Sequence, residues 1–206
     1  DVAQIPVNLK AVGMINRELA EKNLILPVSV NEHSMVLVTN DPLNYFALEE
    51  VRQQTGCHLE IQLSEEVPLK KAVSYYYAEV HARKAAKQAN VGFSTTDIDE
   101  LEIENLDNPD EAPIIQLLNS LIERAIKAEA SDIHIEPFEQ ETNVRMRIDG
   151  VVSEYVKIQK NIHGPLIARI KILANLDIAE KRIPQDGHFR VALGDGQQVN
   201  IRVSVL

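Results

Sequence analysis

A stretch with almost no periodically spaced apolar residues lies near the middle of this chain. Residues 88–110 are rich in Asp, Glu, Asn and Thr, and the part from Asp97 to Glu111 is strongly acidic. Such a composition cannot bury enough apolar surface to order itself, which predicts an exposed linker. The 206 residues therefore separate into two small domains. We predict a first domain at 1–87, an acidic flexible linker at 88–109 and a second domain at 110–206.

The first domain is predicted to be a small α/β domain. Residues 1–10 show little periodicity, whereas 24–30 and 35–39 are typical of strands. Asp41 and Pro42 favour a helix start, with Asp41 as the cap, and Gly56 favours its end. Its apolar face is predicted to comprise Leu43, Phe46, Ala47, Leu48 and Val51. Alternating Leu59, Ile61 and Leu63 predict a half-buried strand, and a helix is expected over 67–87.

The second domain is predicted to be α+β, with antiparallel hairpins and helices packed on one face. A helix opens near Pro113, and alternation over 143–148 before Asp149-Gly150 indicates a hairpin. The other expected elements are strands at 131–136 and 151–156, a helix at 161–175, and a second hairpin of 188–193 and 198–205 joined by the turn at 194–196. The chain ends inside that last strand, so we expect it to be part of a longer protein.

Charge and composition exclude several classes of protein. The formal net charge of -10 disfavours a broad grip on nucleic acid, because phosphate binding needs clustered cations. No run of about 18 apolar residues occurs, and the N-terminus lacks a signal-peptide pattern. The single cysteine, Cys57, excludes an intrachain disulfide and is expected to be a small core residue. A cytoplasmic protein fits these features.

Motifs for catalysis are missing from the sequence. It contains no G-x-x-x-x-G-K-[ST] loop and no serine or cysteine in a recognisable nucleophile motif. His134 and Glu136 alternate outward on one strand and could ligate a metal, but a solvated or hydrogen-bonded strand face is the simpler interpretation. We therefore predict no catalytic residue and no metal site in this chain.

Basic residues of the second domain are the more informative set. Guanidinium groups suit phosphate oxygens because they donate two parallel hydrogen bonds. In the last strand, Arg202 is expected to point outward, because Val199, Ile201 and Val203 share the opposite, apolar face. Lys171 is expected on the same helix as Arg169. By composition alone, most of these side chains are solvated or paired with carboxylates. The candidate arginines are Arg145, Arg147, Arg169, Arg182 and Arg202.

Four segments resemble a known family in order and spacing. They are ASDIHIEP at 130–137, VRMRIDGV at 144–151, LDIAEKRIPQDG at 176–187 and NIRVS at 200–204. The chain resembles the N-terminal region of the GspE/PilB-type ATPases of type II secretion and type IV pilus assembly. The resemblance is strong over 113–206 and continues more weakly over 15–80.

That resemblance implies most of the function expected here. Walker A, Walker B and the Mg²⁺ site would lie in a C-terminal domain beyond Leu206, so this chain alone should not hydrolyse ATP. The second domain would be PAS-like and would supply the five candidate arginines to the nucleotide, with Arg202 as the best candidate. The parent would be a cytoplasmic homohexamer at the inner face of the cytoplasmic membrane. Its first domain would dock onto an inner-membrane platform protein, and no nucleic-acid partner is implied.

Two rival functions remain open. One is a regulatory module that binds a small ligand or second messenger, and the other is a retraction-type motor of the same superfamily. In some relatives an upstream region binds cyclic di-GMP through paired R-L-G-x-x-L motifs, and this sequence contains no such motif.

Overall fold

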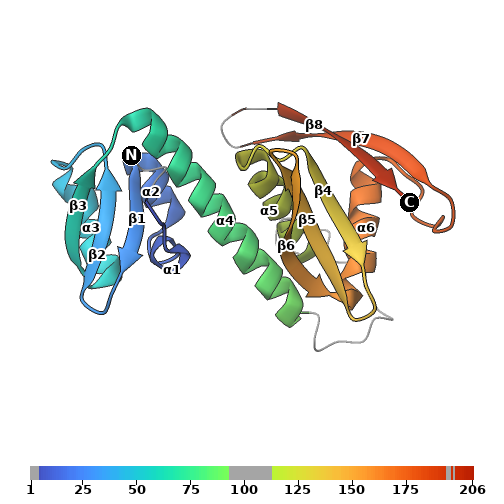
Figure 1. The fold of residues 1–206 in the computed structure, drawn as a ribbon, viewed down its shortest axis with the longest axis horizontal. Coiled ribbons are helices and arrows are strands. Elements are labelled where there is room, and N and C mark those ends of the chain that lie inside the picture. The colour runs from blue at the N-terminus through green and yellow to red at the C-terminus, as the bar shows by residue number, and fades with distance from the viewer. Residues whose placement is uncertain (1–4, 93–112, 194–195, 197) are drawn as a thin grey trace, which may run out of the picture. The chain divides into compact units, whose positions relative to one another are not determined.

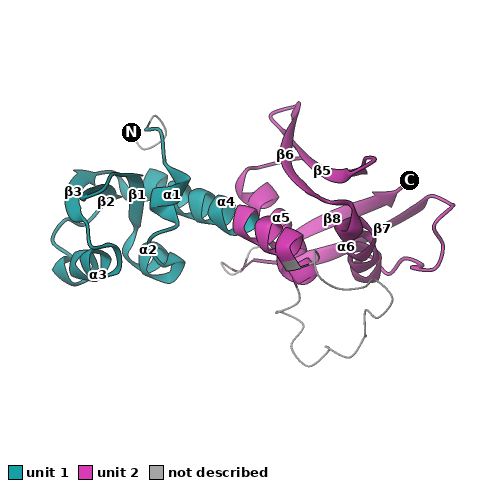
Figure 2. Ribbon diagram, turned by 90° about the horizontal axis from the view of Figure 1, so that it is seen from below, with its two compact units in different colours: residues 1–82 teal, residues 83–206 magenta. Residues whose placement is uncertain are grey.

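A computed structural model describes residues 5–92, 113–193, 196 and 198–206. The chain divides into two compact units, Asp1–Ala82 and Arg83–Leu206 (Figure 2). Both combine helices with small sheets, so the predicted α+β class is confirmed.

The first unit is a three-stranded sheet with helices (Figure 1). Strand order is β1-β2-β3; the β1–β2 pair is antiparallel and the β2–β3 pair is parallel. A parallel pair needs a crossover, which α3 supplies. The elements are α1 (Leu9–Val12), α2 (Arg17–Asn23), β1 (Ile25–Val30), β2 (Ser34–Thr39), α3 (Tyr45–Thr55), β3 (His58–Leu63) and α4 (Glu66–Gly92).

The core of this unit forms where β1, β2 and the helices bury their apolar faces. Leu26, Met35 and Leu37 are completely buried, and Cys57 belongs to the same cluster, as predicted. From α4, the buried Tyr77 hydroxyl donates to the Ile15 carbonyl at 3.2 Å. This bond satisfies a polar group that burial would otherwise leave without a partner.

Two helices were not predicted in the N-terminal segment. The side chains of Asn8 and Asn16 cap α1 and α2, accepting from the Lys10 and Glu18 amides at 2.8 Å each. These helices have 4 and 7 residues. A helix this short gives too few turns to produce a recognisable apolar period.

The predicted start of α3 at Asp41-Pro42 is wrong. The helix begins at Tyr45, and Asn44 is its cap, accepting from the Ala47 amide at 3.2 Å. The Asp41 carboxylate instead accepts from the Leu43 amide in the preceding turn. Ala47, Leu48 and Val51 form the buried face, and Gly56 ends the helix with φ 68° as predicted.

Four apolar side chains predicted to pack inward are exposed. Leu43 precedes the helix and is 69% exposed, while Phe46 is 93% exposed. On the edge strand β3 only Leu59 is buried, whereas Ile61 and Leu63 are open to solvent. An edge strand has a neighbour on one side only, so its alternation does not ensure burial.

The second unit contains a three-stranded antiparallel sheet, β4-β5-β6, and a separate hairpin, β7-β8. The antiparallel strands predicted for the second domain are therefore present, as two separate sheets. Asp149 and Gly150 have φ 50° and 79°, the positive pair that a type I′ turn requires, and the predicted hairpin is confirmed. The elements are α5 (Pro113–Lys127), β4 (Asp132–Pro137), β5 (Glu141–Ile148), β6 (Val151–Gln159), α6 (Lys160–Leu173), β7 (Gln185–Ala192) and β8 (Gln198–Val205).

The core of the second unit joins the sheet, α5 and α6. Leu117, Leu121, Met146 and Ile158 are among its fully buried members. The C-terminal turns of α4 belong to this core as well, through Ala86 and Ala89. Helix α4 thus runs past the predicted boundary at 87, so residues 88–92 are helical instead of linker. The remainder of the predicted linker lies outside the described residues.

Candidate functional site

The β7–β8 hairpin has one apolar and one polar face. Phe189, Val191 and Ile201 lie on the apolar face and pack against the core of the second unit. Side chains of the other face are open to solvent. They include Asp186, His188, Arg190, Asn200, Arg202 and Ser204. The orientation predicted for Arg202 is confirmed.

Two arginines lie on this polar face. Arg202 is directly opposite His188 across the hairpin, and Arg190 is opposite Asn200. The Arg190 Nε donates to Asn200 Oδ1 at 2.9 Å. An Arg202 guanidinium nitrogen is 3.7 Å from the Asp186 carboxylate, in a pair whose side chains are 84% and 62% exposed. An ion pair this exposed contributes little free energy, so a more highly charged anion can displace the Asp186 carboxylate from Arg202.

At Gly187 the backbone of β7 passes very close to the end of α6. A Cβ added at Gly187 would lie 2.8 Å from the Ala174 carbonyl oxygen and 2.9 Å from Leu176 Cδ2. A residue with a side chain would fit here only if β7 or the end of α6 moved. This contact explains the glycine at position 187 of the QDG sequence.

The loop between α6 and β7 is held by two polar side chains. Lys171 is 4% exposed, and its Nζ donates to the carbonyls of Asp177 at 3.2 Å and Glu180 at 2.5 Å. The Gln185 Nε2 donates to the same two carbonyls, and its Oε1 accepts from the Asp177 amide at 2.8 Å. The segment at 176–185 is therefore a defined structure that orients the hairpin. Lys171 has a structural role and is not presented to a ligand.

Arg145 and Arg147 point to the outer face of the β4-β5-β6 sheet. Arg145 pairs with Glu136 at 3.3 Å. Arg147 pairs with Asp132 at 3.0 Å and donates to the Gly150 carbonyl at 3.1 Å. Both guanidinium groups therefore already have carboxylate partners within their own sheet.

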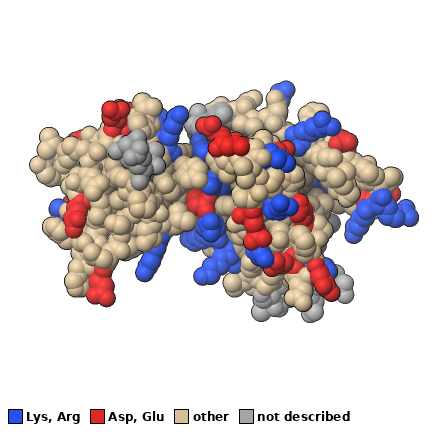
Figure 3. Space-filling model, viewed as in Figure 1, with Lys and Arg blue, Asp and Glu red and all other residues tan. Residues whose placement is uncertain are grey.

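The other two candidates differ in exposure. Arg182 is 91% exposed in the loop before β7, with Glu180 at 3.6 Å. Arg169 is half-buried on α6 and has no ion pair with another described residue. Lys and Arg side chains gather at the end of the second unit where the loop and hairpin lie (Figure 3, right). Arg202 and Arg190 are thus placed on one surface, with Arg182 in the loop that leads to it.

Arg190 was missed by the sequence analysis. Its outward direction could have been predicted from the strand period. Phe189 and Val191 alternate with His188 and Arg190, as Ile201 alternates with Arg202.

Metal binding and membrane crossing find no support in the described residues. There, no three His, Cys, Asp or Glu side chains come together as a possible metal site. None of the helices of the described part has the length and hydrophobicity needed to span a bilayer.

The described part of the chain thus consists of two α+β units, and the second unit presents exposed arginines on a hairpin. The family model described as "MshEN domain" matches residues 1–83, and that described as "Type II/IV secretion system protein" matches residues 107–206. The chain belongs to the GspE/PilB class of type II/IV secretion system proteins.

Curated relatives agree with this assignment. The Myxococcus xanthus "Type IV pilus assembly ATPase PilB" is 36% identical over 198 residues, covering 94% of this chain and 35% of the relative. The Dickeya dadantii "Type II secretion system protein E" is 39% identical over 214 residues, covering 98% of this chain and 42% of the relative. This chain thus spans well under half of these relatives. A solved structure, "Structure of MshE with cdg", matches 37% of this chain and 56% of its own at 22% identity, with a TM-score of 0.35.

Proposed function

We propose that this chain is the adaptor and nucleotide-sensing part of a hexameric cytoplasmic ATPase that powers type IV pilus assembly or type II secretion. Its first unit docks onto the inner-membrane platform protein. Its second unit contacts bound ATP through Arg202 and couples hydrolysis to movement of the platform. The parent acts at the inner face of the cytoplasmic membrane.

The observation that carries this proposal is the exposed guanidinium of Arg202 on a hairpin that packs against the core of the second unit. The apolar face of the hairpin packs against the core, so the backbone from which the exposed Arg202 side chain extends has a defined position. Phosphate oxygens fit such a group, because a charged fork binds them bidentately. Bound ATP and Mg²⁺ would supply the phosphoryl chemistry, and this chain would hold the terminal phosphate.

The five arginines contribute unequally in this proposal. Arg202 and Arg182 have long, exposed ion pairs of 3.7 and 3.6 Å. Arg190, on the same face as Arg202, binds Asn200 through its Nε. Arg182 lies in the adjoining loop. Arg145 and Arg147 would have to break closer ion pairs before they could reach a nucleotide.

Turnover of the full-length protein tests the role of Arg202. Replacing Arg202 with Ala should lower ATPase turnover about 10- to 100-fold, because a desolvated charge-assisted contact is worth about 1.5–3 kcal/mol. Arg52→Ala is the matched control, because it removes an exposed paired arginine from the first unit. Unchanged turnover of Arg202→Ala in an intact hexamer would show that the arginine has no role at the nucleotide. The 206-residue chain alone should show no turnover.

Docking by the first unit is supported by its exposed apolar side chains. Leu43, Tyr45 and Phe46 are each more than two-thirds exposed around the start of α3. Exposed apolar groups that lie together mark interaction surfaces. Co-sedimentation of the full-length protein with inner membranes that contain or lack the platform protein tests this part separately.

A further inference from the structure

Strand β3 is the outer strand of the first sheet and pairs with β2 alone (Figure 1). The amides of His58 and Ser64 donate to carbonyls at the two ends of the β2 segment, at 2.8 and 3.0 Å. In a parallel pair, the residues that bond to the neighbouring strand alternate along the chain. The even-numbered residues therefore bond to β2, and Leu59, Ile61 and Leu63 direct their N–H and C=O groups away from the sheet. None of these outward groups has a hydrogen bond to another residue in the described part of the chain.

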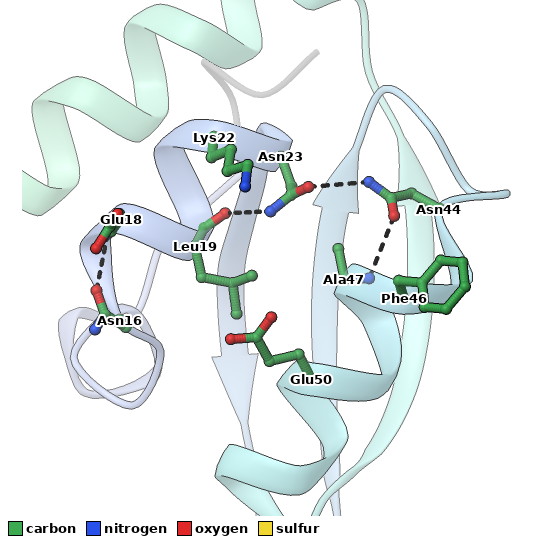
Figure 4. Close-up of a pocket in the computed structure, with 9 residues that line it drawn as sticks. All are labelled: Asn16, Glu18, Leu19, Lys22, Asn23, Asn44, Phe46, Ala47 and Glu50. Atoms are coloured by element: carbon green, nitrogen blue, oxygen red, sulfur yellow. Dashed lines mark hydrogen bonds between the residues drawn. The ribbon is translucent and has the colours of Figure 1, made fainter.

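Helix α3 leaves the last part of β3 uncovered. Its first turn is tied to α2, because Asn44 Nδ2 donates to Asn23 Oδ1 at 3.0 Å (Figure 4). Helix α2 leads directly into β1, which lies at the opposite edge of the sheet. The start of α3 is thus held toward β1. Along β3, Leu59 is buried, whereas Ile61 is 38% exposed and Leu63 is 68% exposed.

The opposite edge of the sheet is protected against pairing, and β3 is not. Strand β1 contains Pro27, which has no N–H, and a bulge between Pro27 and Ser29. Its Val28 carbonyl also accepts from the Asn8 amide at 2.8 Å. Proline, bulges, edge lysines and covering segments all hinder pairing with another chain. Strand β3, with the sequence HLEIQL, has no proline or lysine and keeps a regular register with β2, so it remains open to a further strand.

We propose that β3 pairs with β3 of a second copy of this chain, antiparallel and centred on Ile61. Ile61 then faces Ile61 of the second copy, Leu59 faces Leu63, and each pair exchanges two hydrogen bonds. All outward groups of β3 are satisfied, and the exposed Ile61 and Leu63 side chains gain apolar neighbours. The same surface is used by both copies, so the contact closes as a dimer. This contact goes beyond the proposed function, because it joins the first units directly.

Charged and polar side chains select this register. Glu60 lies opposite Gln62 of the second copy, in a pair whose side chains are close together. Neither has a hydrogen bond or ion pair with another described residue, so the Gln62 amide can donate to the Glu60 carboxylate. Sliding one strand by two residues places Glu60 opposite Glu60, and like charges directly opposite are destabilising. Sliding it the other way leaves Leu59 opposite Glu65, beyond the strand. This reciprocity of Glu60 and Gln62 favours a second copy over an unrelated strand.

Sedimentation velocity of the full 206-residue chain tests the proposal. A reversible monomer–dimer equilibrium is expected as the concentration rises, because one short strand per copy makes a small interface. Gln62→Glu places a carboxylate opposite each Glu60 and should raise the dissociation constant about 3- to 30-fold. Gln62→Lys should lower it by a similar factor. The double variant Glu60→Gln/Gln62→Glu exchanges the two groups and should dimerise as the wild type does.

Gln53 supplies the matched controls. It is exposed on α3 of the same unit, so Gln53→Glu and Gln53→Lys change the net charge equally but away from the β3 edge. They should change the dissociation constant less than two-fold.

Ile61→Pro tests the backbone contact. The Ile61 N–H does not bond to β2, so proline removes an outward donor without breaking a hydrogen bond within the sheet. This variant should be monomeric, with ¹H–¹⁵N NMR spectra to show that it is folded. If it does not fold, the variants of exposed Gln62 decide the proposal.

A chain that stays monomeric at every concentration, or that associates into species larger than a dimer, would overturn the proposal. Shifts in the same direction for Gln62→Glu and Gln62→Lys, or equal effects at Gln53, would do so as well. The proposed function is measured separately, by turnover of Arg202→Ala and by membrane co-sedimentation. A monomeric chain would leave both of those results unaffected.

Discussion

Replacing Gly187 with Ala should destabilise the second unit by steric overlap alone. Gly187 does not have a positive φ, so alanine is allowed by its backbone. The added Cβ, however, would lie 2.8 Å from the Ala174 carbonyl oxygen and 3.2 Å from the Ala174 Cβ. The first contact is with backbone, so β7 or the end of α6 must move.

The size of the effect follows from two opposing terms. Overpacking of this kind costs about 1–3 kcal/mol. Reduced freedom of the unfolded chain returns about 0.4–1 kcal/mol. The net loss is about 1–2 kcal/mol. A unit of about 120 residues has an unfolding entropy near 0.25 kcal/mol per degree, so the Tm should fall by about 4–8 °C.

Scanning calorimetry of the full chain measures this shift. Gly13→Ala is the matched control, because its Cβ would meet only ordinary contacts of 3.5–3.7 Å and its φ is -69°. That variant should keep or slightly raise the Tm. A Tm for Gly187→Ala equal to or above that of the wild type would refute the steric argument, and with it the explanation given for the glycine at this position.

Other substitutions test further contacts. Lys171→Met should cost about 1.5–3 kcal/mol in urea unfolding, because two loop carbonyls lose a charged donor, whereas exposed Lys181→Met should stay within about 0.5 kcal/mol. Tyr77→Phe should cost about 1 kcal/mol through loss of the bond to the Ile15 carbonyl, and an equal cost for exposed Tyr45→Phe would contradict this. Burial lowers the pKa of His163, so the unfolded chain binds more protons and stability should fall as pH drops below about 6.5. The fall in Tm between pH 7.5 and 5.5 should be smaller in His163→Gln, and an equal fall in both proteins would refute the assignment.

Local patterns predicted most of the second unit because its elements are determined by nearby residues. The Asp149-Gly150 turn and the alternation over 143–148 are each recognised from a few consecutive residues, without knowledge of distant contacts. The outward direction of Arg202 follows from the strand period in the same way. Burial of Lys171 could not be predicted, because its partners are carbonyls in a loop whose shape depends on packing against α6.

The first unit was harder to predict from sequence for a related reason. Asp41 and Asn44 are both possible N-caps for α3. Asn44 is the cap in the structure, and its side chain also donates to Asn23 on α2. That contact joins residues 21 positions apart. The exposure of Phe46 likewise depends on which side of α3 meets the sheet.

The C-terminal turns of α4 have a practical consequence for dissecting this protein. Ala86 and Ala89 fill the core of the second unit, and the Asn90 side chain accepts from the Gln159 amide at the start of α6 at 2.9 Å. Residue 107, where the match to the secretion family begins, lies beyond all three. A recombinant domain started there would lack part of its own interior, so a soluble and stable version should begin no later than Arg83.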